Sequence, residues 1–276
     1  MKYVFQLLCL LGASLIALQP SQSILADEIN HDHFIIHSIP KCGTHCLERA
    51  ITLLTDKLVL SGGYSPELLD QAEQLNKIVR IHQAYDKPIV KALKKRNYKI
   101  ISMSRDPRDA LVSVLFFMRR LKDRGLQRDF FKVSADFDTM SLDEQLAALI
   151  TGTHDMQSYL EYYQNRAGWI LDNYSLGIKY EDLVGSEGGG DNRIQQNAII
   201  KIANYIHMPL SDEKLNFVVS NLYQKIGRDA EQDGKVYMRS EVGNWKTFFN
   251  AEHKKMFKQR CGKLLIKLGY EKDLNW

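Results

Sequence analysis

The chain has 276 residues, of which 45% are hydrophobic and 25% are charged. This is the composition of a globular protein, and the length is sufficient for one large hydrophobic core. Thirty-seven lysines and arginines against 33 acidic residues give a net charge of only +4, which argues against a nucleic-acid-binding protein.

The beginning of the chain differs from the rest. A lysine follows the initial methionine, residues 3–18 are apolar and uncharged, and Ala26 offers a small residue at a cleavage position. This order is typical of an export signal. The sequence therefore predicts a signal peptide over 1–26 and a single domain over 27–276. An uncleaved membrane anchor through 3–18 is the alternative, although the run is slightly short for a spanning helix of ~20 residues.

Buried strands alternate with amphipathic helices along the remaining chain. The predicted strands are 34–38, 78–82, 98–104 and 175–180. The predicted helices are 44–55, 88–96, 107–121, 142–151, 155–173, 193–206, 212–222 and 251–268. Such alternation indicates βαβ units, so we expect a three-layer α/β fold whose mostly parallel central sheet is flanked by helices.

Three segments show no clear hydrophobic period of a helix or a strand. Residues 123–140 mix charged and aromatic residues, and we expect a mobile lid over an acceptor site there. Residues 226–242 are similarly irregular, and we expect them to fold over a bound nucleotide. The glycine-rich run at 185–191 is expected to be a flexible surface connection, because no buried strand with a basic residue leads directly into it.

The junction between the first strand and the first helix has the residues of an anion site. It carries Lys41, Cys42, Gly43, Thr44 and His45. Backbone N–H groups and the positive end of the helix dipole converge at a helix N-terminus. Gly43 permits a close approach of the backbone, and Lys41 adds a positive charge. In the Walker A pattern, by contrast, the lysine follows the glycines.

A second strand-to-helix junction lies near residue 105. Asp106 is a good N-cap, and Pro107 occupies the first helical position. Arg105 then lies at the strand end, and Ser113 lies about two turns along the helix. Both can reach one anion at the carboxyl edge of a parallel sheet, where open α/β folds bind their ligands.

These two motifs resemble those of sulfotransferases that use 3′-phosphoadenosine 5′-phosphosulfate (PAPS). Pro-Lys-x-Gly-Thr resembles the family's loop for the 5′-phosphosulfate, and Arg-Asp-Pro-Arg-Asp-x-x-x-Ser resembles its segment for the 3′-phosphate. Three further segments follow in the family's order. Those at 79–83 and 178–183 place His82 and Tyr180 at strand ends, and the segment at 237–246 resembles the C-terminal loop of the donor site.

The resemblance implies transfer of a sulfuryl group from PAPS to a hydroxyl or amine of a small-molecule, carbohydrate or peptide acceptor. His82 would be the general base, and Lys41 would neutralise charge on the leaving nucleotide. Neither a metal nor a nucleic acid is implied. The residues implied in donor binding are Lys41, Cys42, Gly43, Thr44, His45, Arg105, Ser113, Tyr180, Arg239 and Ser240.

The sequence departs from the family pattern at four positions. His45 and Cys46 stand where a hydroxyl residue and a tryptophan are usual, Ser240 stands where glycine is usual, and Asn244 stands where aspartate is common. These departures leave open a non-catalytic protein that binds a nucleotide or a sulfated ligand. A small-molecule kinase is a further alternative, but it requires a Walker lysine and a Mg²⁺-binding Ser/Thr–Asp pair, which are not evident.

The leader yields a prediction about the native protein. If residues 1–26 are a signal, the protein is exported to the cell exterior, the periplasm or a secretory lumen, and its N-terminus lies near Asp27. If they are an anchor, the intact chain is found with membranes. Cell fractionation followed by N-terminal sequencing distinguishes the two, and a cytosolic product that still begins at Met1 contradicts both.

Overall fold

Five parallel strands form one sheet in the order β2-β3-β1-β4-β5. The structure is a computed structural model that describes residues 33–125, 131–222 and 241–276. The strands are β1 (Phe34–Ser38), β2 (Val59–Ser61), β3 (Ile78–Ile81), β4 (Lys99–Ser104) and β5 (Ser175–Lys179).

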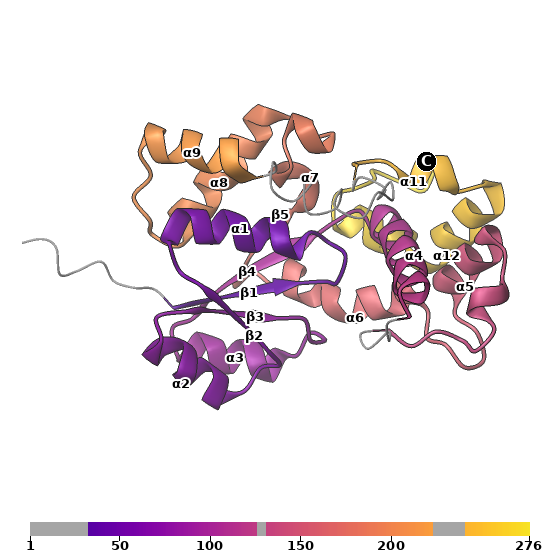
Figure 1. The fold of residues 1–276 in the computed structure, drawn as a ribbon, viewed down its shortest axis with the longest axis horizontal. Helices are drawn as coiled ribbons and strands as arrows, with labels where there is room; N and C mark the ends of the chain where they lie inside the picture. The colour runs from indigo at the N-terminus through magenta and orange to yellow at the C-terminus, as the bar shows by residue number, and fades with distance from the viewer. Residues whose placement is uncertain (1–32, 126–130, 223–240) are drawn as a thin grey trace, which may run out of the picture. The chain divides into compact units, whose positions relative to one another are not determined.

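The central strands are buried on both faces. Ile35 of β1 is in register with Val79 of β3 and with Ile100 of β4, and all three side chains are fully buried. Strands of this kind read as continuous apolar runs, which is why β1, β3 and β4 stand out in the sequence. Since the strands are parallel, all their carboxyl ends meet at one edge of the sheet, where α4 begins (Figure 1).

Helices cover both faces of the sheet and extend beyond its carboxyl edge. They are α1 (Thr44–Thr55), α2 (Pro66–Gln74), α3 (Lys87–Lys95), α4 (Pro107–Asp123), α5 (Leu142–Thr151), α6 (Tyr159–Leu171), α7 (Tyr180–Leu183), α8 (Asn192–Tyr205), α9 (Asp212–Leu222), α11 (Trp245–Phe248) and α12 (Ala251–Lys267). Two short 3₁₀ turns are η1 (Phe137–Thr139) and η2 (Ser186–Gly188).

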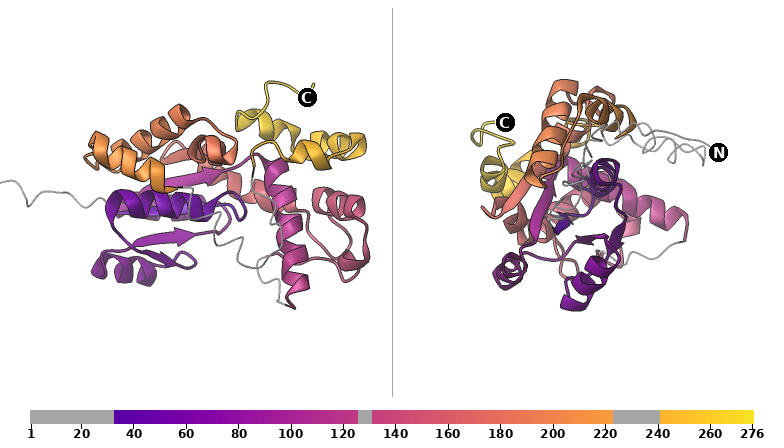
Figure 2. Two further views of the ribbon diagram at one scale, coloured as in Figure 1. Left: turned by 45° about the horizontal axis from the view of Figure 1, so that its top comes forward. Right: turned by 90° about the vertical axis from the view of Figure 1, so that its left-hand side faces the viewer.

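Two hydrophobic clusters join these layers. On one face, α1, α8 and α9 pack against β1, β4 and β5. On the other, α2, α3 and the end of α6 pack against β1, β3 and β4. Figure 2 shows the same division from a second direction. The predicted three-layer α/β fold with a parallel sheet is confirmed, and it has the P-loop-like arrangement of strands and helices.

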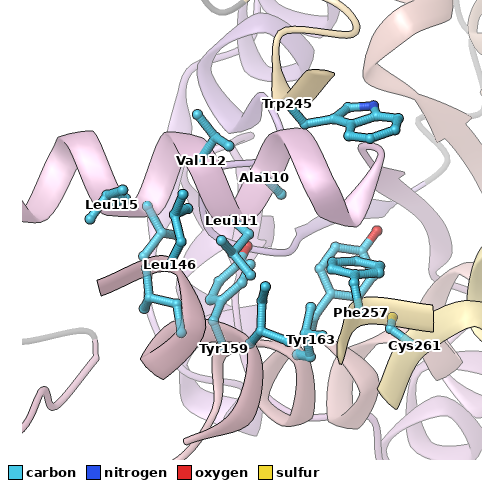
Figure 3. Close-up of a cluster of buried hydrophobic side chains, with 14 of the residues drawn as sticks. Ala110, Leu111, Val112, Leu115, Leu146, Tyr159, Tyr163, Trp245, Phe257 and Cys261 are labelled. Carbon is cyan, nitrogen blue, oxygen red and sulfur yellow. The ribbon is translucent and has the colours of Figure 1, made fainter. Parts of the chain in front are cut away.

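A third cluster joins the helices beyond the carboxyl edge. In Figure 3, Leu111 and Leu115 of α4 point toward Leu146 of α5 and Tyr159 of α6. On the opposite side of α4, Trp245 of α11 lies against the helix (Figure 3). The N-terminal half of α4 is therefore held from both sides, and the helix begins two residues after Arg105.

The predicted strands and helices are confirmed with small changes of their bounds, while one strand and three helices of the described residues, besides the two 3₁₀ turns, were not predicted. Of these, β2 has three residues, and α7 and α11 have four residues each, too short to show a period. The fourth, α2, begins with the Ser65 N-cap and Pro66, a start signal that was present in the sequence.

The expectation of a mobile lid over 123–140 is wrong for residues 131–140. Phe131 and Phe137 are buried, and they belong to the cluster between α4, α5 and α6. Gln145 of α5 donates a hydrogen bond to the Phe137 carbonyl at 2.6 Å and accepts one from Arg119 of α4 at 2.9 Å. The aromatic side chains of this segment thus serve the core, and a segment without period can still be packed.

Two predicted features lie outside the described residues. The leader over 1–26 is one of them, so the signal peptide stays a prediction. The greater part of the segment at 226–242 is the other. In the described parts of the chain, no helix is long and apolar enough to cross a membrane.

Candidate functional site

The turn between β1 and α1 depends on two residues in the left-handed region. Lys41 has φ = 72° and Gly43 has φ = 94°. The N–H of Cys42 closes the turn by donating to the Ile39 carbonyl at 3.0 Å. A glycine at position 43 is required because positive φ is costly for residues with a Cβ atom.

The ring of Tyr180 adds a second reason for a glycine at position 43. A Cβ atom on Gly43 would overlap Cδ2 of Tyr180 and lie 2.9 Å from its Cε2. Tyr180 itself is buried at the start of α7, directly after β5. The loop after β1 and the residue after β5 are therefore in direct contact.

The first turn of α1 presents backbone donors. The Gly43 carbonyl accepts from the N–H groups of Cys46 and Leu47, and the Gly43 N-cap supplies no side-chain acceptor. The N–H groups of Thr44 and His45 precede the first intrahelical bond, so they are available to an external acceptor. An anion placed there also meets the positive end of the helix dipole.

The Lys41 ammonium is surrounded by positive charge. Its Nζ lies 4.0 Å from the ring centroid of Phe117 on α4. Burial, together with the guanidinium groups of Arg120 and Arg105, lowers its pKa from 10.5 to about 8. Cations gathered in this way favour a bound anion.

Arg105, directly after β4, is almost completely buried, with 3% of its surface exposed. Its guanidinium stacks on Tyr180 at 4.7 Å and donates long hydrogen bonds to the carbonyls of Lys41 (3.5 Å) and Glu241 (3.3 Å). Within the described residues, its Nε is buried and makes no hydrogen bond. An unsatisfied buried donor of this kind calls for an additional acceptor.

His82 directly follows β3. Its Nδ1 lies 2.6 Å from the Ser38 carbonyl, which can only accept, so Nδ1 carries a proton. The neutral ring therefore has its lone pair on Nε2. Burial lowers the pKa of His82, and the Ser38 carbonyl opposes this shift only in part. The hydrogen bond thus fixes the tautomer and leaves Nε2 able to accept a proton.

Residues 241–245 connect the site to α4. The Asp109 carboxylate accepts from the N–H of Gly243 at 2.7 Å and from that of Trp245 at 2.8 Å. The Glu241 carbonyl accepts from Arg105. The described end of the C-terminal loop motif is thus held beside the strand end of β4.

The remaining predicted site residues differ in where their side chains lie. Cys42 is buried, and burial raises the pKa of its thiol to about 12, so only its backbone can serve the site. The His45 side chain is 83% exposed and pairs with Glu48. Ser113 lies one turn before Phe117, on the face of α4 that meets Lys41. Arg239 and Ser240 lie outside the described residues.

Sequence reasoning missed two tyrosines that support the loops of the site. Tyr159 donates to the Pro40 carbonyl, and Tyr163 donates to the Arg105 carbonyl, both at 2.8 Å. Both belong to α6, far along the chain from the loops that they hold. Tyrosines on the buried stripe of a helix resemble ordinary core residues, so the sequence offered no distinct signal for this role.

An all-parallel α/β sheet with an anion-attracting glycine loop at its first helix defines a protein of the P-loop-like class. Within this class the chain belongs to the sulfotransferase domain family, whose model matches residues 31–269. Membership supports sulfuryl transfer as the general activity. In the described parts of the chain, no group of three or more histidines, cysteines or carboxylates forms a metal site.

Curated relatives agree with this assignment. Mouse sulfotransferase 6B1 is 23% identical over 273 residues, covering 89% of this chain and 82% of the relative. Mouse sulfotransferase 4A1 is 22% identical over 247 residues, covering 83% of this chain and 80% of the relative.

Solved structures share the fold. Mouse sulfotransferase SULT7A1 complexed with PAP has a TM-score of 0.60 at 15% identity, covering 86% of this chain and 87% of the other. Retinol dehydratase in complex with androsterone and inactive cofactor PAP has a TM-score of 0.57 at 16% identity, with coverages of 85% and 80%.

The depressed pKa of Lys41 predicts a stability gain when its charge is removed. Below pH 8 the folded protein carries the buried ammonium at a cost, and this cost declines as pH rises from about 8 to 10.5. Lys41→Met should therefore raise the free energy of unfolding at pH 7 by about 1–3 kcal/mol. Urea unfolding measures the change.

The control is Lys91→Met, on the exposed side of α3. This substitution should change stability by no more than about 0.5 kcal/mol. A Lys41→Met protein that is less stable than the wild type at pH 7 would show that the ammonium is already satisfied within the protein.

Proposed function

We propose that this protein transfers the sulfuryl group of PAPS to a hydroxyl or amine of an acceptor. The single observation that carries the proposal is the gathering of the Lys41 ammonium, the Arg105 guanidinium and the N-terminus of α1, where Arg105 Nε is buried without a hydrogen-bond partner in the described residues. Family membership supplies the reaction class, and the neighbours complexed with PAP suggest the donor.

The donor's 5′ end fits the loop after β1. The N–H groups of Thr44 and His45 would hold the phosphosulfate, and Lys41 would stabilise the charge that develops on the leaving oxygen. The Thr44 hydroxyl donates its proton to Ser38 Oγ at 2.9 Å, so this proton is not available to the phosphosulfate. Backbone donors and one ammonium therefore make up the described phosphosulfate site.

The donor's 3′-phosphate fits the unsatisfied guanidinium of Arg105. A phosphate beside Nε would supply the missing acceptor in a charge-assisted hydrogen bond. Ser113 and Arg239 are the further residues proposed for this phosphate, and Tyr180 would keep the guanidinium plane in place by stacking. This set is expected to separate PAPS from nucleotides without a 3′-phosphate.

His82 would take the proton from the hydroxyl or amine of the sulfuryl acceptor through Nε2. Its Nδ1 proton is bound to the Ser38 carbonyl, so the ring cannot turn without losing that hydrogen bond. Arg166 donates to the His82 carbonyl at 2.7 Å and fixes the backbone as well. The acceptor oxygen then forms the bond to sulfur as the bond from sulfur to the nucleotide oxygen breaks.

The direct test is incubation of the protein with labelled PAPS and an acceptor library that contains sugars, phenols and tyrosyl peptides. Transfer of label to an acceptor supports the proposal. Tight binding of the product nucleotide without any transfer favours the non-catalytic binding protein. Transfer from labelled ATP in place of PAPS favours the kinase.

A 3′-phosphate site predicts nucleotide selectivity. Each charge-assisted hydrogen bond contributes roughly 1.5–3 kcal/mol, so 3′-phosphoadenosine 5′-phosphate (PAP) should bind at least about tenfold more tightly than adenosine 5′-phosphate (AMP). Arg105→Ala should reduce this ratio, whereas Arg260→Ala on the exposed side of α12 should leave it unchanged. Calorimetry measures both affinities, and equal affinities in the wild type contradict the site.

The proposed base predicts a separation of binding from turnover. His82→Ala should lower kcat by ~10²–10⁴ with little change in PAP affinity, since the ring touches only the acceptor's proton. Because burial lowers the pKa of His82, the wild-type rate should fall at a lower pH than the ordinary histidine pKa would give, as protonation removes the base. His154→Ala, whose side chain is 90% exposed, is the matched control. Near-normal turnover in His82→Ala would assign the base to another residue.

A further inference from the structure

Residues 270–276, here called the tail, follow the region that matches the family model. The tail nevertheless returns to the junction of β4 and α4. The Tyr270 hydroxyl lies 3.1 Å from Ser104 Oγ and donates to Glu181 Oε2 at 3.2 Å. The other oxygen of Glu181 accepts from the N–H of Asp106 at 2.8 Å. The tail is thus bonded directly to Ser104, and through Glu181 to Asp106, the two residues that flank Arg105.

A second contact joins the tail to Arg108 in the first turn of α4. Arg108 is a buried cation at a helix N-terminus, where the dipole disfavours it. Asp106 binds its Nε at 2.9 Å and its Nη2 at 2.6 Å, while Glu271 of the tail binds its Nη1 at 2.6 Å. The position of this guanidinium therefore depends on one carboxylate from the tail.

Trp276 makes the third contact. The Arg108 guanidinium carbon lies 4.1 Å from the ring centroid of Trp245 and 4.3 Å from that of Trp276. The two indoles meet edge to face with centroids 5.5 Å apart, and Trp276 also meets Phe257 of α12. Trp276 thus packs beside Trp245 and holds it against Arg108.

Trp245 transmits this contact to the candidate site. Its N–H and that of Gly243 are bound by Asp109, so the position of Trp245 fixes residues 243–245 on α4. Two residues earlier, the Glu241 carbonyl accepts from Arg105. A shift of Trp245 would therefore shift the partner of the guanidinium proposed to bind the 3′-phosphate.

We propose that the tail is a positioning element for the 3′-phosphate site, with Trp276 as its decisive residue. It acts through Arg108 and Trp245 on the orientation of Arg105, and the hydrogen bonds and ring contacts described above go to the β4–α4 junction, to Glu181 and to Trp245. The inference rests on the proposed function, since it concerns selectivity for a 3′-phosphorylated nucleotide.

The position of the tail predicts a selective defect. Loss of Trp276 should weaken contacts to the 3′-phosphate and leave the 5′-phosphate contacts intact, because the latter come from the start of α1. If the tail served only stability, its loss would lower the affinities for both nucleotides equally, through partial unfolding, or would change neither affinity. The ratio of two affinities therefore separates positioning from stability.

The experiment measures Kd for PAP and for AMP by calorimetry on the full chain, and KM for PAPS together with kcat. Trp276→Ala should weaken PAP binding about tenfold, the scale of one misplaced charge-assisted hydrogen bond. AMP binding should stay within about twofold of the wild type. KM for PAPS should rise with kcat little changed.

Two further variants test the mechanism. Trp276→Phe keeps an aromatic ring against Arg108 and removes an indole N–H that is buried without an acceptor in the described residues, so it should restore most of the selectivity. Leu274→Ala is the control in the same tail, since Leu274 lies against Gly262 of α12. It should leave both affinities unchanged. If Trp276→Ala does not fold, Glu271→Gln removes the tail's carboxylate charge and should lower the same ratio.

The outcomes separate the two proposals. A wild-type protein that binds PAP no better than AMP overturns the proposed function and this inference together. A selective wild type whose PAP-to-AMP ratio is unchanged in Trp276→Ala and Glu271→Gln overturns this inference alone. An equal loss of both affinities assigns the tail a purely structural role and also overturns it.

Discussion

A buried positive charge with an unfilled hydrogen-bond donor is the feature on which the candidate site depends. Arg105 is buried with an Nε that has no hydrogen-bond partner in the described residues, and the Lys41 ammonium has its pKa lowered by burial and by two guanidinium groups. The carboxylates of Asp109 and Glu181 interact with Arg105 electrostatically, whereas Asp106 and Glu271 bind the guanidinium of Arg108 directly. Aromatic rings lie against the two cations of the site, with Phe117 under Lys41 and Tyr180 under Arg105. Rings orient these cations without neutralising them.

The parallel sheet explains how distant residues reach this point. Lys41 follows β1, His82 follows β3, Arg105 follows β4 and Tyr180 follows β5. These residues lie at the same edge of the sheet because the carboxyl ends of parallel strands meet there. Lys41 and Arg105 could be predicted from the sequence because each stands at a junction between a buried strand and a helix start. His82 and Tyr180 were expected at strand ends only through the resemblance to the family.

The rest of the site could not be predicted, because it depends on packing between segments far apart in the chain. Tyr159 and Tyr163 hold the loops through backbone carbonyls, which carry no sequence signal. Residues 131–140 were expected to be loose because they lack a period, yet two phenylalanines draw them into the core. Cys42 stands within the anion loop but turns its thiol into the helical cluster. Position in a motif does not determine where a side chain points.

The cysteines have a consequence for the conditions that the protein can tolerate. Cys42, Cys46 and Cys261 are all buried and unpaired. Burial raises the pKa of each thiol to about 12, so almost none of the reactive thiolate exists at neutral pH. Three thiols shielded in this way offer oxidants little to attack. The described cysteines are therefore compatible with both reducing and oxidising surroundings.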